Sequence, residues 1–407
     1  MVGTLAGLGV AYLDRRLRAA SAGGLVDWRR AERIAIARLR RAPGSLDPAE
    51  LRRVAPAYDE AMRRIVPALE NALGTHLPGV VERHAVVDRP TWALANLEVF
   101  RAIYGRIETV LGDQLTPRSG SIGSGLAAAA NRQVATQQVA FFLGYLGTRV
   151  LGQYDIALLS AEAHPGQLLF VEENIRATAA KLGVPVAGFR TWVALHETTH
   201  AFEFEAHPWV RAYLSERLER QLASLVEEAQ LLGVEGIRRL VRRWRHTRSE
   251  GGPGGADRAG GLIGGILTDE QRRLWREVQV AMSVLEGFSD WVMDSVGAEF
   301  IPNVADLRRR FEERRGAPRS TFDRLVSRLT GMDLKIEQYR RGERFVAGVA
   351  AVGGPTAVAR LWDGPTSLPT ELEMADPAAW VHRVVGPGAA GGVEVGPGAA
   401  GTGSAGG

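Results

Sequence analysis

The sequence predicts a mainly α-helical protein, and two observations lead to that prediction. Apolar residues recur at three- and four-residue spacing along most of the 407 residues, which is typical of amphipathic helices. Strand patterns are few, and the best of them is the short apolar run Gln167–Val171. We therefore expect a large helical domain with at most a small β element.

The helical segments share one pattern, in which Arg and Glu separate the apolar positions. They cover Leu25–Arg41, Asp47–Gly74, Pro90–Leu111, Gly125–Leu151, Trp209–Arg248, Thr268–Val296, Val304–Arg315, Arg319–Arg344 and Phe345–Trp362. The segment Thr268–Val296 starts with Thr268 and, three residues later, Gln271, which are the residue types of a capping box. The predicted strand follows Pro165-Gly166 and precedes a polar Glu-Glu-Asn sequence.

Two segments are rich in glycine and are not expected to join the core. Ser249–Gly265 holds eight glycines and one proline, which predicts a mobile loop between two helical stretches. Residues 385–407 are Gly/Ala/Pro-rich, and their Val-Gly-Pro-Gly-Ala-Ala-Gly sequence occurs twice, which predicts a disordered tail. Composition does not change on either side of the loop, so we expect a single domain over residues 1–384.

Composition excludes several classes of function. The chain has no cysteine, which excludes disulfides, thiolate metal sites and cysteine nucleophiles and leaves His and carboxylates as metal ligands. A net charge of +4 is too small to require a nucleic-acid partner, and the basic stretch Arg238–Arg248 is interpreted as a solvated face. We expect no membrane span. The apolar run Val2–Leu13 lacks the positive start of a secretory signal, so we expect a cytoplasmic protein.

The motif that carries chemistry is His196-Glu197-Thr198-Thr199-His200. On a helix, residues four apart lie on one face, so His196 and His200 can present both imidazoles to one metal ion. Zn²⁺ takes such nitrogen ligands and lowers the pKa of its bound water to about 7. Glu197 lies where its carboxylate can take the proton of that water, which predicts a metallohydrolase.

A third protein ligand is needed, and Glu286 is our prediction for it. The spacing of a third histidine in metzincins would require His at position 206, where this chain has Ala206, with His207 one position late. Glu286 and Asp290 lie four residues apart on an otherwise apolar helix, where an acid is costly unless it is paired or binds metal. We assign Asp290 as the acceptor for an imidazole N–H of a ligand. Competitors for the third ligand position are Glu203, Glu205, Asp294 and Glu299.

In these motifs and in several other segments that occur in the same order, the sequence resembles the zincin-like metallopeptidases of type 2. These bacterial and archaeal proteins are often described as hydrolases associated with biosynthesis of a deazaflavin coenzyme. The resembling segments are Arg149–Asp155, Leu168–Val171, Asn174-Ile175, Phe189–Val193, Pro208-Trp209, Leu285–Gly287, Val292–Asp294, Lys335–Phe345, Trp362–Pro365, Leu368-Pro369 and Asp376–Trp380. This chain departs from the family at Phe288, where the family often has His, and at Glu173, where it often has Pro. The resemblance implies a mostly helical zinc hydrolase, gluzincin-like in its ligands, with a zincin-like active-site helix.

The main functional hypothesis is a zinc-dependent peptidase that acts on a peptide or protein and uses Glu197 as the general base. Tyr339, with Lys335 on the same helical face, is a candidate donor to the oxyanion, and a packing role for Tyr339 is the alternative. If Leu168–Val171 is an edge strand, an extended peptide could add to it. The alternative function is a non-catalytic, zinc-containing scaffold or binding protein in a redox-coenzyme pathway.

Overall fold

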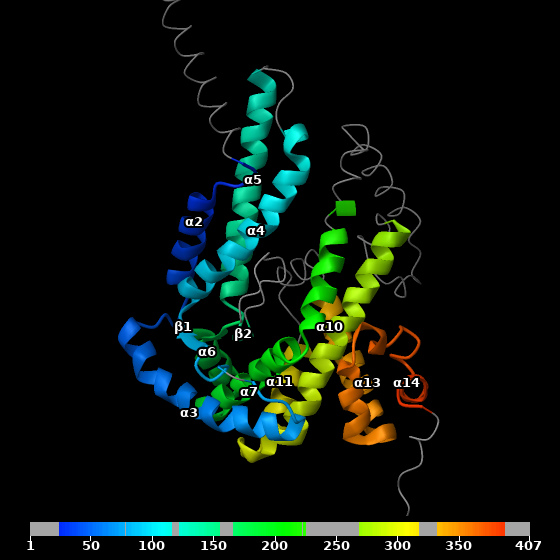
Figure 1. Ribbon diagram of the computed structural model, residues 1–407. Coiled ribbons are helices and arrows are strands. Elements are labelled where there is room, and N and C mark those ends of the chain that lie inside the picture. The colour runs from blue at the N-terminus through cyan, green and yellow to red at the C-terminus, as the bar shows by residue number, and fades with distance from the viewer. Residues whose placement is uncertain are drawn as a thin grey trace, which may run out of the picture. The chain divides into compact units, whose positions relative to one another are not determined.

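The computed structural model describes residues 24–77, 79–115, 122–154, 166–221, 223–224, 268–316 and 332–386 (Figure 1). The predicted mainly helical fold is confirmed, since long helices dominate these residues and the described strands form one small sheet. The expected loop at 249–265, the basic stretch 238–248 and nearly all of the tail at 385–407 lie outside the described residues.

The chain divides into two compact units. The first comprises residues 1–279 and 292–325, and the second comprises residues 280–291 and 326–407. Helix α10 (Asp269–Val296) runs through both, because its middle turns belong to the second unit and its two ends to the first. A single domain over residues 1–384 stays a prediction.

Four helices come first in the described part of the first unit: α2 (Trp28–Arg40), α3 (Pro48–Leu73), α4 (Arg89–Leu115) and α5 (Ile122–Gly147). Helix α3 starts at a capping box, in which Asp47 accepts from the Glu50 N–H and Glu50 accepts from the Asp47 N–H. Helices α2, α4 and α5 lie side by side (Figure 1) and share one apolar core. That core consists of Val26, Ala31, Ala35, Leu97, Val139, Ala140 and Leu143.

The small sheet has the strand order β1–β3–β2. Strand β3 (Leu168–Val171) is the predicted one, and it pairs in parallel with β1 (His84–Val87) and antiparallel with β2 (Gly152–Tyr154). The expectation that Leu168–Val171 forms an edge is therefore wrong, because this strand is central and all four of its residues are buried. Within the described residues, β2 is an edge strand.

Helix α6 (Glu172–Leu182) follows β3 directly, and α7 (Val186–Glu205) carries the His-Glu-x-x-His motif. A further helix covers residues 208–221, the described part of the segment predicted at 209–248. Helix α10 starts at the predicted Thr268–Gln271 capping box, and α11 is Val304–Gly316. Buried side chains lie around almost the whole of α7, including Phe189, Val193 and Phe202, so this helix is part of the core.

The second unit contains the middle turns of α10, helix α13 (Met332–Ala359), two short 3₁₀ turns and helix α14 (Pro377–Val384). Trp380 of α14 is fully buried against Phe345 of α13. Among the described residues, Arg341–Trp362 is long and apolar enough to cross a membrane by length and composition, which is weak evidence, and 39% of that window is buried. The backbone leaves helical geometry within it at Gly354, before Pro355.

Candidate metal centre

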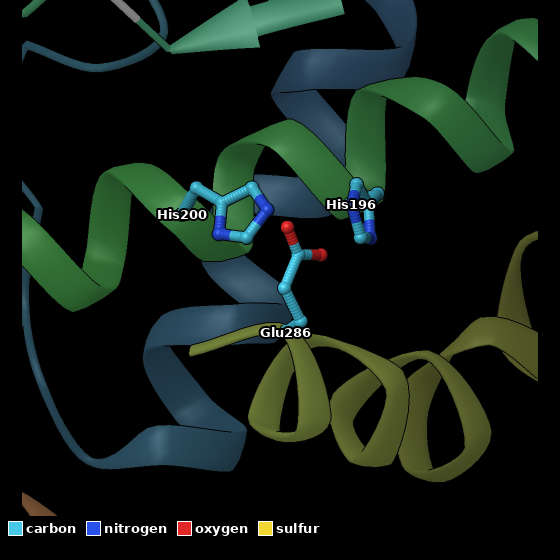
Figure 2. Close-up of side chains that lie close together, drawn as sticks. All are labelled: His196, His200 and Glu286. Carbon is cyan, nitrogen blue, oxygen red and sulfur yellow. The ribbon is translucent and has the colours of Figure 1, made fainter. Parts of the chain in front are cut away.

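Three side chains from α7 and α10 form a group that could hold a metal ion. His196, His200 and Glu286 each offer one ligand atom, and these three atoms lie within 4.8 Å of one another. Figure 2 shows the Glu286 carboxylate extending from α10 toward the two imidazoles of α7. The i, i+4 spacing places His196 and His200 on the same face of α7, with their ring centroids 4.7 Å apart.

The donor set fits zinc. Two imidazole nitrogens and one carboxylate oxygen are the ligands of catalytic zinc sites, which keep a fourth position for water or substrate. All three residues are half-buried, as expected for a site that a substrate must reach. The Trp192 indole stacks almost parallel to the His196 ring, with centroids 5.9 Å apart, and so restricts the orientation of that imidazole.

The orientation of His200 is set by Glu203, one helical turn further along α7. The His200 Nδ1 lies 2.7 Å from Glu203 Oε2, and the Glu203 side chain is fully buried. A carboxylate that accepts from Nδ1–H leaves Nε2 as the nitrogen that can bind metal. From the sequence, Glu203 was predicted only as a competing ligand. A carboxylate three residues after a histidine is common on helices, so the complete burial of Glu203 is what identifies this role.

Glu197 lies against strand β2. The Tyr154 N–H donates to Glu197 Oε2 at 3.2 Å. A Cβ atom at Gly152 would lie 2.6 Å from the Glu197 Cγ, so the glycine leaves the space that this side chain occupies. Residues 152–154 form β2, so a short strand contacts the candidate base.

Glu286 lies where α10 and α13 approach closely within the second unit. A Cβ at Gly342 of α13 would lie 1.8 Å from the Ser283 carbonyl oxygen, and a Cβ at Gly287 would lie 2.3 Å from the Gly342 carbonyl carbon. Only glycine at both positions permits this backbone contact. Glu286 lies between Ser283 and Gly287 in the sequence, so the contact defines the position of the turn that carries it.

Two other predicted site residues, Asp290 and Tyr339, lie on α10 and α13. Asp290 is half-buried one turn after Glu286 on α10, and its pairing with a ligand imidazole stays a prediction. Tyr339 lies on α13, three residues before Gly342. Its role as an oxyanion donor also stays a prediction.

The competing ligands are engaged elsewhere or exposed. Glu205 pairs with Arg83 at the C-terminal end of α7. Asp294 is exposed and pairs with Arg308, and Glu299 is exposed in a 3₁₀ turn.

A buried ionic cluster fixes the start of α7. Glu172 of α6 has no exposed surface and accepts from the Arg190 guanidinium of α7, from Arg176 Nε at 2.7 Å and from the Tyr58 hydroxyl of α3 at 2.7 Å. Burial, followed by the Glu172 charge, raises the pKa of Tyr58 well above its usual value. The cluster holds α3, α6 and α7 together, and it supplies the partners that the buried Glu172 carboxylate needs. None of its residues is a candidate metal ligand.

Comparisons with known proteins identify the family of this chain. No curated protein matches the chain. A crystal structure from Chloroflexus aurantiacus, described as that of "a putative hydrolase with a novel fold", shares 32% sequence identity and a TM-score of 0.62, and covers 88% of this chain and 98% of its own. The sequence matches the zincin-like metallopeptidase family over residues 26–381, which include the three candidate ligands and Glu197. The chain belongs to the zincin-like metallopeptidase family.

Proposed function

We propose that this chain is a zinc-dependent peptidase in which His196, His200 and Glu286 hold the metal and Glu197 is the general base. The convergence of the three ligand atoms within 4.8 Å is the observation that carries the proposal. Zinc held there would polarise a substrate carbonyl and lower the pKa of a coordinated water. Glu197 would take the proton from this water and deliver it to the leaving amine.

Two features favour a peptide over a small amide as the substrate. Strand β2 is an edge strand in the described part of the sheet, and it lies beside Glu197. An extended peptide can add to such an edge through main-chain hydrogen bonds. Its scissile carbonyl would then lie near the base and the three ligands.

Tyr339 is proposed as a donor to the oxyanion that forms during attack. Tyr339→Phe removes the hydroxyl and keeps the ring, so it should lower kcat and leave the zinc content unchanged. A variant with unchanged kcat would assign Tyr339 to packing.

The first experiment measures metal content by mass spectrometry on four purified proteins. We expect about one zinc per chain in the wild type and in Glu197→Gln, and loss of zinc in Glu286→Ala. Asp294→Ala is the matched control, because it removes an exposed carboxylate from the same helix, and it should keep its zinc. A folded wild type that binds no zinc when zinc is supplied would refute the metal site.

The second experiment tests peptide hydrolysis with a library of internally quenched fluorescent peptides. Cleavage by the wild type should be abolished by a chelator, be restored by zinc, and fall by roughly 10²–10⁴-fold in Glu197→Gln, as expected for a lost general base. Zinc binding without cleavage of any peptide would instead favour the non-catalytic scaffold.

A further inference from the structure

Strand β2 contacts the candidate base Glu197 on α7. Gly152 and Tyr154 of the strand meet different atoms of the Glu197 side chain. At Gly152, a Cβ would lie 2.6 Å from Cγ and 3.0 Å from both Cδ and Oε1 of Glu197. At Tyr154, the main-chain N–H donates to Oε2. One carboxylate oxygen therefore packs against the glycine backbone, and the other accepts a hydrogen bond two residues further along the strand.

Any side chain at position 152 would change this arrangement. Heavy atoms do not approach a Cβ within 3.0 Å in real structures, so Glu197 would have to leave its present rotamer. The atom that is met most closely is Cγ, in the middle of the side chain. A small rotation of the carboxylate alone would therefore not relieve the overlap.

The strand is itself held in place through the Tyr154 side chain. The Tyr154 hydroxyl donates to Glu205 Oε1 at 2.8 Å, and Arg83 donates to both oxygens of Glu205 at 2.5 Å. Glu205 is the last residue of α7, two turns after Glu197, so the same helix carries the base and the acceptor for Tyr154. Tyr154 is nearly fully buried, and its ring packs against the backbone of Gly166.

Gln153, between Gly152 and Tyr154, anchors the opposite side of the strand. Trp92 Nε1–H of α4 donates to Gln153 Oε1 at 2.6 Å, and the Gln153 amide donates to Asn96 at 3.1 Å. Side chains alternate along a strand, so Gln153 fixes β2 to α4 while the residues on either side of it contact α7.

We propose that β2 positions the general base: Gly152 leaves the space for the Glu197 side chain, the Tyr154 N–H holds its carboxylate, and the Tyr154–Glu205 bond fixes the strand to α7. Gly152 and Tyr154 are positioning residues, because they act through Glu197. The inference rests on the proposed function, in which Glu197 is the base.

The test uses cobalt-loaded protein and acetohydroxamate, a small chelator whose acidic proton a correctly placed carboxylate can accept. Cobalt(II) gives a visible absorption spectrum, so the dissociation constant of acetohydroxamate can be measured without a known substrate. Loss of one hydrogen bond to a charged group should weaken binding by roughly ten- to a hundredfold in Glu197→Gln. We expect Gly152→Ala to weaken it to within about threefold of that value.

The double variant separates positioning from general damage. If Gly152 acts through Glu197, adding Gly152→Ala to Glu197→Gln should change the dissociation constant by less than about twofold, because the group it displaces is already inactive. An equal weakening in both backgrounds, or none in either, would overturn the proposal. Gly188→Ala is the control on α7, where a Cβ would meet only Ile301 at 3.9 Å, and it should bind like the wild type.

Two further readouts keep the test decisive. If Gly152→Ala does not fold, Tyr154→Phe replaces it, and a severalfold weakening that disappears in the Glu197→Gln background supports the proposal. Equal binding by Tyr154→Phe and the wild type overturns it. A wild type that binds no cobalt refutes the proposed function itself, whereas cobalt binding with a weakened Glu197→Gln and an unaffected Gly152→Ala refutes only the role of β2.

Discussion

Replacing Gly342 with alanine tests the backbone contact that places Glu286. The new Cβ would lie 1.8 Å from the Ser283 carbonyl oxygen, about 1.6 Å short of the 3.4 Å at which ordinary van der Waals contact begins. The overlap joins two helix backbones, so no rotamer change can relieve it and α10 and α13 must separate. Overpacking of this kind costs about 3 kcal/mol, and the better helix propensity of alanine returns only about 1 kcal/mol.

We therefore expect Gly342→Ala to lose about 2 kcal/mol of stability and to melt several degrees below the wild type. It should also bind zinc more weakly, because the displaced turn carries Glu286. Differential scanning calorimetry of the metal-free proteins measures the first effect, and competition with a chromophoric zinc chelator measures the second. Gly188→Ala is the helical glycine control. A Gly342→Ala protein that melts and binds zinc like this control would show that the two backbones do not meet at this glycine.

Three other predictions concern buried partners. Glu203→Ala removes the carboxylate that orients His200 and should weaken zinc binding by roughly 10–100-fold in the chelator competition, whereas Glu203→Gln, which keeps an acceptor, should restore part of it. The pKa of Tyr58 is raised in the folded state, so its neutral form is favoured there, and its stabilisation is present below pH about 10 and is lost as pH rises above 10. Urea unfolding between pH 8 and 11 should show this loss, with a smaller slope in Tyr58→Phe. Arg89→Met leaves the buried Glu173 carboxylate without its ion-pair partner and should cost about 3–5 kcal/mol in the same unfolding assay; a loss under 1 kcal/mol would contradict that pairing.

The long helices could be predicted because their apolar faces repeat over many turns. Periodicity located α2, α3, α4, α5, α10 and α11 to within a few residues at most of their ends. Two short strands and α6 were missed for a physical reason. Strands β1 and β2 have four and three residues, too few for an alternating pattern to stand out. Helix α6 begins with Glu172, Glu173 and Asn174, which look like a loop in the sequence but are buried because arginine side chains pair with them.

The candidate site could be predicted where its geometry is local. A spacing of four residues brings His196 and His200 together on any helix, and acids on the otherwise apolar α10 indicated Glu286. The His200–Glu203 bond is also local, but a carboxylate three residues after a histidine is common on exposed helices. Only its complete burial, which the sequence does not reveal, identifies its function.

Two contacts around the site depend on glycines, because they need positions that carry no side chain. Strand β2 reaches Glu197 at Gly152, and α13 reaches the Glu286 turn where Gly342 meets Gly287. Each glycine allows a backbone to approach a functional residue more closely than any Cβ would permit. A glycine in a short apolar segment is ordinarily interpreted as a turn or as weak structure. In this chain, helix α7 carries two candidate ligands and the proposed base, and glycines mark where other elements approach that base and the turn that carries the third candidate ligand.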